Sequence, residues 1–206
     1  MSQSVMLFEK IRDDIIAGDL PPGTRLPQQR IADRYEVSKV LTVAAFSRLE
    51  SAGLVESAIG EGVRVRTIDR EMLEGEYTFR EAIEVQAIRE ACQHASEREV
   101  AELRRMSEQL EAAQEQEAIR IDQQFHLKIA KMSRCQRLVK ELNQLQLVQM
   151  FVSQVTVANQ NWPYTHSKLV DLIEKGDPDA AEAEMRWHIQ TARKNGIQAF
   201  LESRSA

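Results

Sequence analysis

Asp122 and His126 lie four residues apart in the stretch "RIDQQFHLKIAKM". Residues with this spacing lie one turn above each other on a helix, so the carboxylate and the imidazole share a stripe with Phe125 and Ile129. Burying such a pair without partners costs roughly several kcal/mol, so each group needs a hydrogen bond, an opposite charge or a metal ion. The two groups can satisfy each other at the edge of a core, or they can be two ligands of a larger site.

Two further histidines are also expected to face apolar surroundings. His166 shares a helical stripe with Leu169 and Val170, and His188 shares one with Met185. Spacing alone does not bring these residues together. The remaining histidine, His94, is expected at the end of a helix with no role in metal binding.

The composition is that of a soluble, mostly helical protein. The chain has 206 residues, of which 43% are hydrophobic and 29% charged, with only 8 Gly and 5 Pro. This length allows two small domains or one medium domain. No segment approaches the roughly 18 uninterrupted apolar residues of a membrane helix, and the N-terminus lacks a signal-peptide layout. We therefore expect a cytoplasmic protein with no membrane partner.

Charge and cysteine content exclude some classes of protein. The formal net charge of −5 argues against general affinity for nucleic acid, but residues 1–70 hold ten basic and ten acidic residues. A neutral N-terminal part permits DNA contact on one basic face. Cys92 and Cys135 form no C-x-x-C pattern, which argues against a disulfide scaffold and against a cysteine zinc site.

The N-terminal third predicts three helices followed by a β-hairpin. Apolar residues at helical spacing run from Val5 to a stop at Gly18, and "PPG" then breaks the chain before the short helix "QQRIADRYE". Ser38 is a natural N-cap for a third helix that ends at Gly53. "LVES" and "VRVRT" predict two strands around a glycine-containing turn. Together these elements predict a winged helix-turn-helix, whose third helix would enter the major groove.

The rest of the chain predicts an all-α bundle. Few helix breakers occur after Asp69, and Gly176, Asp177 and Pro178 provide a stop, a cap and a start for the last helix. The fold class is therefore mainly α, with a DNA-binding domain over 1–68 and a helical domain over 69–206. The six expected helices lie near 70–95, 97–116, 118–132, 135–158, 163–175 and 178–202.

Specific motifs resemble the GntR family of bacterial transcription regulators. "IIAGDLPPGTRLPQQRIADRYEVS", "RLESAGLVES" and the wing "GEGVRV" are similar to that family's winged helix-turn-helix. "DQQFH", "HSKLVDLIEKGD" and "DAAEAEMRWHI" resemble the FCD ligand-binding domain of the FadR-like branch, in its six-helix form. The two resemblances cover nearly the whole chain.

The FCD resemblance implies a ligand set for the polar residues of the bundle. In that family, an Asp and three His coordinate one divalent metal inside the helical domain. The matching residues here are Asp122, His126, His166 and His188. The resemblance therefore implies one divalent metal per chain, with zinc and nickel as the preferred ions.

Arg80, in "TFREAIE", matches an arginine that the family places on the first helix of the bundle, facing the pocket. A guanidinium there would grip the carboxylate of a small organic acid that also completes the coordination of the metal. The alternative for Arg80 is an ion pair with Glu84 on an exposed helix face. Such a pair is worth only about tenths of a kcal/mol.

The predicted DNA-contacting residues depart from the family pattern. Where the family usually reads "VSRTPVREAL", this chain reads "VSKVLTVAAF", so Lys39 and Val43 replace two arginines, and Gln29 aligns with a third. Gln prefers adenine and Val offers a methyl contact to thymine, so the base preference should differ from that of typical relatives. The predicted DNA-contacting set is Gln29, Arg30, Ser38, Lys39, Thr42, Val43 and Arg64.

The combined prediction is a homodimeric transcription regulator that binds a double-stranded operator and responds to a metal and a small organic acid. One alternative is a metal-binding protein that has lost DNA binding, with Val43 as a relic of that loss. A second is a metal-dependent enzyme, because a metal with open positions can activate water. The chain has no HExxH motif, no evident general base and no Gly-rich phosphate loop, so we predict that it is not an enzyme.

Overall fold

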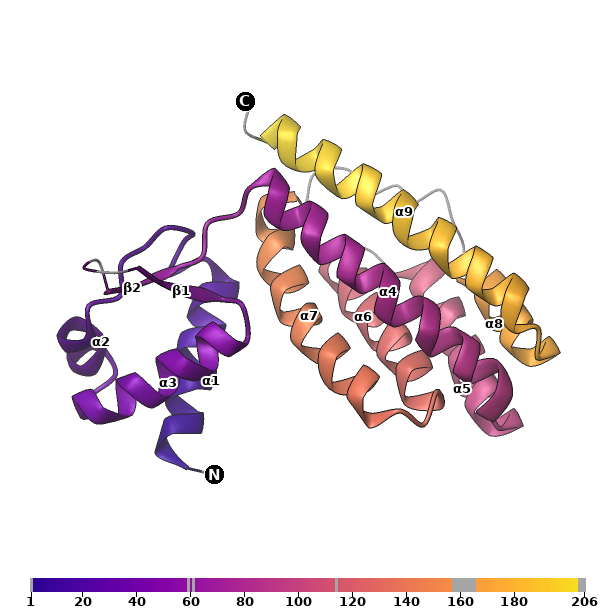
Figure 1. The fold of residues 1–206 in the computed structure, drawn as a ribbon, viewed down its shortest axis with the longest axis horizontal. Helices are drawn as coiled ribbons and strands as arrows, with labels where there is room; N and C mark the ends of the chain where they lie inside the picture. The colour runs from indigo at the N-terminus through magenta and orange to yellow at the C-terminus, as the bar shows by residue number, and fades with distance from the viewer. Residues whose placement is uncertain (1, 59, 61, 114, 157–165, 204–206) are drawn as a thin grey trace. The chain divides into compact units, whose positions relative to one another are not determined.

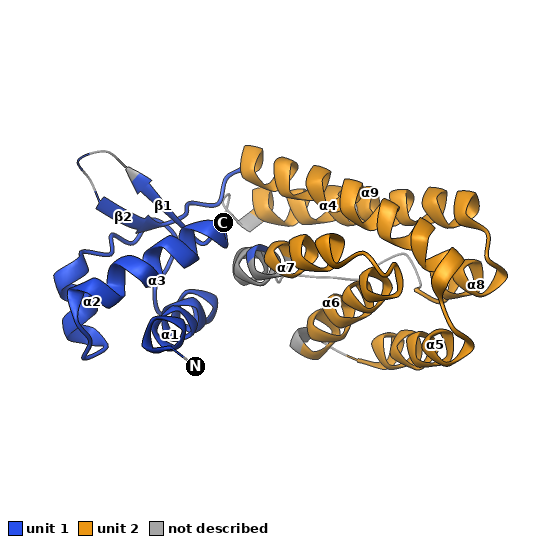
Figure 2. Cartoon of the chain, turned by 60° about the horizontal axis from the view of Figure 1, so that its bottom comes forward, with its two compact units in different colours: residues 1–69, 147–155 blue, residues 70–146, 156–206 orange. Residues whose placement is uncertain are grey.

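The computed structural model describes the chain except residues 1, 59, 61, 114, 157–165 and 204–206. Its described residues form two compact units, one of residues 1–69 with 147–155, the other of residues 70–146 with 156–206 (Figure 2). Helices make up most of both units, so the predicted mainly α fold class is confirmed (Figure 1). No helix in the described part of the chain is long and apolar enough to cross a membrane.

Three helices and a hairpin build the N-terminal unit, as the sequence predicts. Its elements are α1 (Gln3–Ala17), α2 (Gln28–Arg34), α3 (Lys39–Ser51), β1 (Val55–Ala58) and β2 (Gly62–Val65). Gly18 ends α1 in the left-handed conformation, with φ 86°. Both α1 and α2 pack against α3. Leu7, Ile11 and Ile15 of α1 supply fully buried side chains, because they share one face of the helix.

The hairpin is antiparallel and has a third partner. Val55 pairs with Val65, and Glu56 pairs with Arg64. The segment after the "PPG" turn also bonds to β2, since the Leu26 amide donates to the Val63 carbonyl at 2.8 Å. This hydrogen bond joins β2 of the hairpin to the segment that precedes α2. The N-terminal unit is therefore a winged helix-turn-helix.

Six helices follow in the described part of the chain, and all of them except residues 147–155 of α7 belong to the second unit. They are α4 (Arg70–His94), α5 (Glu97–Ala112), α6 (Glu115–Met132), α7 (Gln136–Thr156), α8 (Ser167–Lys175) and α9 (Pro178–Ser203). All six begin and end within four residues of the predicted bounds. The predicted end of α7 at 158 and the predicted start of α8 at 163 lie outside the described residues. Two boundaries differ near 113: α5 ends at Ala112, where Ala113 turns extended, and α6 already begins at Glu115.

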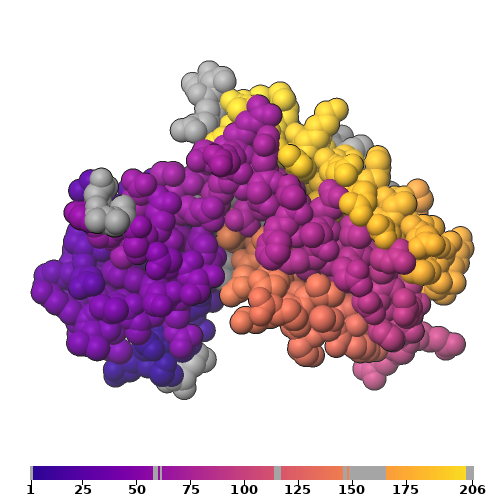
Figure 3. Space-filling view, in the orientation of Figure 1, coloured from indigo at the N-terminus to yellow at the C-terminus, as the bar shows by residue number. Residues whose placement is uncertain are grey.

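Helix α4 is the central element of this unit, because it packs against α6, α8 and α9. It packs along α9, and Figure 3 shows the magenta surface of α4 beside the yellow surface of α9. Gly196 of α9 permits a close approach there, because a Cβ at this position would collide with the Tyr77 hydroxyl. The main core gathers side chains from α4, α5, α6, α8 and α9, including Ile88, Leu103, Phe125 and Met185. A smaller core joins α7 to α4 and α6 through Leu142 and Ala130.

Candidate metal centre

Four potential ligands from three parts of the chain meet in the core of the second unit. Asp122 and His126 come from α6, His166 directly precedes α8, and His188 comes from α9. One donor atom from each residue lies within 4.8 Å of the donor atoms of the other three. The packing of α6, α8 and α9 around α4 therefore joins residues that are 40 and 22 positions apart in the sequence.

The three imidazoles lie in pairwise contact and are almost completely buried. Their exposed fractions are 2% for His126, 5% for His166 and 2% for His188. The ring centroids are 5.5 Å apart for His126 and His166, 5.1 Å for His126 and His188, and 4.7 Å for His166 and His188. The sequence predicts His166 inside a helix, but His166 is the N-cap residue of α8.

The carboxylate of Asp122 faces two of these rings. Its Oδ1 atom lies 2.9 Å from His166 Nε2 and 3.5 Å from His126 Nε2. The second distance is longer than an ordinary hydrogen bond. Neither ring nitrogen of His126 makes a hydrogen bond of regular geometry. Asp122 and His126 therefore form an ion pair at 3.5 Å, as the pairing alternative expects, and Asp122 is also closer to His166 than to His126.

Glu84 is the residue at this site that the sequence reasoning missed. It lies on α4 with 1% exposure, and its Oε2 atom contacts His126 Nδ1. The other carboxylate oxygen accepts a hydrogen bond from Arg80 Nε. The only sequence signal was the i, i+4 spacing of Arg80 and Glu84, which does not reveal whether the pair faces solvent or the core.

Arg80 is buried, with 7% exposure, and forms the predicted ion pair with Glu84. The pair lies in the core and not on an exposed helix face, so the small energy of an exposed pair does not apply to it. Burial lowers the pKa of Arg80, but the carboxylates of Glu84 and Asp122 raise it above the ordinary value. Arg80 thus holds a positive charge close to the Asp122 carboxylate.

The surroundings of the site favour the charged form of Asp122, and they shift the pKa values of His126 and His188 in opposite directions. Burial raises the pKa of Asp122, but the nearby charge of His126 and the contacts with the His126 and His166 rings lower it well below its ordinary value. Burial lowers the pKa of His126, and the charges of Glu84 and Asp122 outweigh it and raise the pKa to about 9. Burial and the neighbouring imidazoles keep the pKa of His188 well below its ordinary value.

The donor set fits a divalent first-row metal. One carboxylate and three imidazole nitrogens are the ligand types that zinc and nickel accept, and each must bind in its deprotonated form. Asp122 already carries a negative charge, and His188 is neutral at physiological pH. The side chain of Asp122 is 30% exposed, so the cluster meets solvent at that residue.

The predicted DNA-contacting residues lie on α2, α3 and β2. Gln29 and Arg30 are exposed on α2, but Gln29 Nε2 donates to Asp33 at 2.6 Å. Arg64 Nε of β2 donates to Glu56 at 2.6 Å across the hairpin.

Ser38, Lys39 and Val43 are exposed at the start of α3, and Ser38 occupies the predicted N-cap position without a side-chain capping bond. Thr42 differs from the expectation, because it is fully buried and its hydroxyl donates to the Lys39 carbonyl at 2.7 Å. Thr42 therefore belongs to the core of the N-terminal unit and not to its exposed face. Val40, which the sequence reasoning did not select, is 79% exposed.

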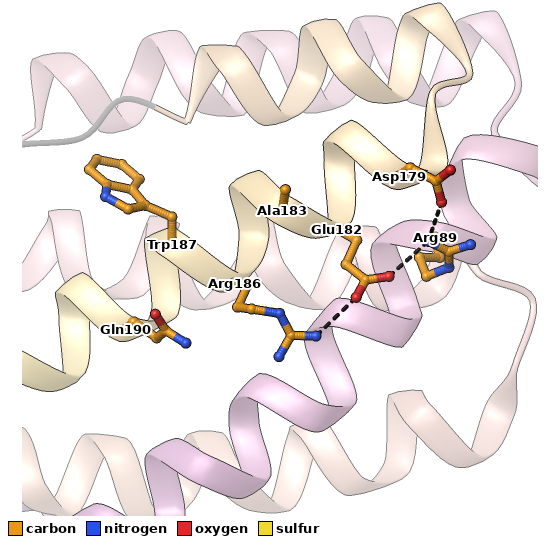
Figure 4. Close-up of a pocket in the computed structure, with 7 residues that line it drawn as sticks. All are labelled: Arg89, Asp179, Glu182, Ala183, Arg186, Trp187 and Gln190. Carbon is orange, nitrogen blue, oxygen red and sulfur yellow. Dashed lines mark hydrogen bonds and ion pairs between the residues drawn. The ribbon is translucent and has the colours of Figure 1, made fainter.

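A surface pocket of about 450 Å³ lies along α4 and α9, apart from the histidine cluster (Figure 4). Its charged residues pair with one another, since Arg89 Nη1 lies 2.7 Å from both Asp179 and Glu182. Arg186 also pairs with Glu182, at 2.9 Å. These ion pairs leave the pocket without an unbalanced charge that would select a ligand.

Two family models match the chain. The model described as the FCD domain matches residues 76–191, and the model described as bacterial regulatory proteins, gntR family, matches residues 3–65. The Nta operon transcriptional regulator of Aminobacter aminovorans is 25% identical over 82% of this chain and 82% of its own length. A probable D-xylose utilization operon transcriptional repressor of Paenarthrobacter nicotinovorans is 28% identical over 89% of this chain and 86% of its own length.

Among solved structures, a transcriptional regulator described as GntR from Rhodococcus sp. RHA1 has the same fold, with a TM-score of 0.75. The comparison covers 96% of this chain and 99% of that chain, at 22% sequence identity. Both parts of the chain are therefore present, in the same order, in relatives that regulate transcription.

Proposed function

This chain belongs to the GntR family of bacterial regulatory proteins, in the FadR-like branch with a C-terminal FCD domain, and we propose that it senses a metal-bound organic acid. Its family and its relatives are transcription regulators, and this chain is likewise a DNA-binding transcription regulator and not an enzyme. We assign operator binding to residues 1–68 and ligand binding and dimerisation to residues 69–206. Because a bacterial operator lies in the cytoplasm, we place the protein there.

One observation carries the proposal of a metal site: four donor groups converge within 4.8 Å in a region where three of them are almost completely buried. Asp122, His126, His166 and His188 would hold one divalent ion, with zinc or nickel preferred by this donor set. When bound, the ion supplies a positive charge and open coordination positions for a carboxylate.

We propose a small organic acid as the effector, with Arg80 as its second anchor. A guanidinium is suited to a carboxylate because it donates two parallel hydrogen bonds. Arg80 bonds to Glu84, which in turn contacts His126, and this connection to the cluster supports the proposed role. The negative Glu84 and Asp122 already engage that charge, so the incoming acid must compete with them for Arg80.

The proposed DNA-contacting face comprises Gln29, Arg30, Ser38, Lys39, Val43 and Arg64. A helix N-terminus with an exposed serine can hold a backbone phosphate, and Lys39 adds a positive charge there. A homodimer would present two such faces to half-sites about one helical turn, or roughly 34–36 Å, apart. An effector changes operator affinity only if it binds the competent and incompetent arrangements with different affinity.

Native mass spectrometry with elemental analysis tests the metal site on protein purified without added metal or chelator. We expect a dimer with one divalent ion per chain, and we expect His126→Ala to remove the ion. A retained organic acid would appear as additional mass that disappears with the ion. A metal-free protein with no affinity for added zinc or nickel would contradict the proposal.

Selection of binding sequences from random duplex DNA tests the other half of the proposal. A conserved site with two half-sites is expected, with binding that weakens steeply as salt rises because several phosphates are contacted. Equal, weak binding to all sequences would instead favour a protein that has lost operator recognition.

A further inference from the structure

Glu84 has no assigned role in metal binding, yet it is the buried carboxylate in contact with the histidine cluster. It is 1% exposed, and its two oxygens contact different partners. Oε1 accepts from Arg80 Nε, and Oε2 meets Nδ1 of His126. A carboxylate at this depth requires such partners, because an unpaired buried charge is strongly unfavourable.

The two nitrogens of His126 have different surroundings. Nδ1 faces Glu84, whereas Nε2 faces Asp122 Oδ1 at 3.5 Å. The same Asp122 oxygen lies 2.9 Å from His166 Nε2. The Nε2 atoms of both histidines are therefore directed toward the carboxylate of the proposed ligand set, and Nδ1 of His126 is directed away from it.

We infer that Glu84 is a positioning residue for the metal: it accepts the Nδ1 proton of His126, fixes the ring orientation and leaves Nε2 as the coordinating nitrogen. The inference rests on the proposed metal-binding function. A carboxylate behind a coordinating imidazole selects the tautomer and makes the coordinating nitrogen more basic, which strengthens metal binding. Arg80 has a part in this arrangement, because its Nε donates to the other oxygen of Glu84 and holds the carboxylate in this orientation.

The arrangement also links the proposed effector anchor to a metal ligand. Arg80, Glu84 and His126 form one continuous chain of contacts on neighbouring turns of α4 and α6. An acid that takes Arg80 away from Glu84 would change the environment of His126 Nδ1. Metal binding and acid binding are therefore expected to influence each other through Glu84.

Glu84→Gln and Glu81→Gln form a matched pair of variants. Both remove one carboxylate charge from α4, but Glu81 pairs with Arg186 and Gln190 of α9 and does not contact the cluster. We expect zinc affinity, measured by competition with a chelating dye, to fall about 10- to 100-fold in Glu84→Gln and to stay within about twofold of wild type in Glu81→Gln. Circular dichroism and thermal unfolding without metal show whether both variants are folded.

A second measurement needs no variant. In zinc-loaded wild-type protein with ¹⁵N-labelled histidine, we expect the His126 ring to carry a proton on Nδ1 and to show a metal-bound shift at Nε2. This result would support the inference even if Glu84→Gln did not fold.

Four outcomes would overturn it. Zinc coordination through Nδ1 of His126, or direct coordination by Glu84 in place of the contact with His126, would assign the carboxylate differently. Equal zinc affinity in Glu84→Gln, Glu81→Gln and wild type would remove its positioning role while leaving the metal site intact. Wild-type protein that binds no zinc would overturn the metal site itself, and the inference with it.

Discussion

At the scale of single residues, we expect the loss of His126 to abolish metal binding while the protein still folds. A ligand that binds only the folded state at 100 times its dissociation constant stabilises that state by about 2.7 kcal/mol. We therefore expect zinc to raise the unfolding temperature of wild type and to leave that of His126→Ala unchanged. His94→Ala is the control, because His94 is exposed at the end of α4. An equal shift in His126→Ala and wild type would argue that zinc binds elsewhere.

The raised pKa of His126 predicts that metal binding releases a proton. Without metal this pKa is about 9, because Glu84 and Asp122 outweigh the effect of burial, so the ring is mostly charged at pH 7. A coordinating imidazole must be neutral, so zinc affinity should rise with pH up to about 9 and then level off. The expected slope from His126 alone is about tenfold per pH unit.

Calorimetry in two buffers with different ionisation enthalpies measures this proton directly. At pH 7 one released proton is taken up by the buffer. The apparent binding enthalpies should therefore differ by at least the difference between the ionisation enthalpies of the two buffers. Identical enthalpies in the two buffers would mean that His126 is already neutral before the metal binds.

At the scale of elements, the start of α5 contains a bonded cluster that should depend on pH. Ser96 and Glu99 form a capping box, and Arg134 donates to both oxygens of Glu99 at 2.6 Å. Arg134 also donates to the His94 carbonyl at 3.2 Å, so it joins the end of α4 to the start of α5. The hydrogen bonds from Arg134 are the main reason why the pKa of Glu99 falls to about 2.

Glu99→Gln should lower the free energy of unfolding by about 1–2 kcal/mol at pH 7. The folded-state pKa is depressed, so this contribution is complete above the ordinary glutamate value of 4.5 and is lost as the pH falls toward 2. Urea unfolding at pH 7, 4 and 3 should show the difference from wild type shrinking over that series. Glu97→Gln, an exposed change in the same first turn, should show less than half the effect at pH 7.

The exposed face of α3 predicts how the operator is read. Val40 and Val43 are 79% and 53% exposed, three residues apart on one face of the helix. Apolar side chains in the major groove contact the methyl group of thymine. Replacing a contacted thymine by uracil removes that methyl group. Burial of one such group contributes about 0.8 kcal/mol to the binding free energy, so its loss should weaken binding roughly fourfold.

Fluorescence anisotropy with a selected operator, in thymine and uracil forms, measures this effect. Val43→Ala should bind both forms alike at the position it reads, because the apolar contact is shortened in the protein itself. Wild-type protein that does not distinguish the two forms at any position would exclude methyl recognition by α3.

At the scale of the whole molecule, metal and operator should influence each other's affinity equally. If zinc changes operator affinity by some factor, the operator must change zinc affinity by the same factor, and allosteric proteins typically show about 5- to 150-fold. Operator titrations with zinc and with chelator, paired with zinc titrations of free and bound protein, measure both factors. Coupling that persists in His126→Ala would mean that zinc acts from another site. No coupling in wild type would assign the metal a purely structural role.

The sequence by itself determined the order of the elements and both parts of the architecture. Helical spacing, the "PPG" break, and the glycines at 18 and 176 act within a few residues, and the corresponding helices begin and end close to the predicted positions. The resemblance in "IADRYEVS" and "DQQFH" supplied the family, which the comparisons confirm. These features depend on local backbone preferences, so they can be read without knowing which helices pack together.

Only the tertiary structure decided which residues meet and which faces are buried. The i, i+4 spacing of Arg80 and Glu84 is the same on an exposed face and in a core, and the packing of α4 against its neighbours places this pair beside His126. Thr42 likewise became a core residue because α1 and α2 cover one side of α3. Helical periodicity defines the faces of each helix, but the contacts that cover one face come from residues far away in the chain.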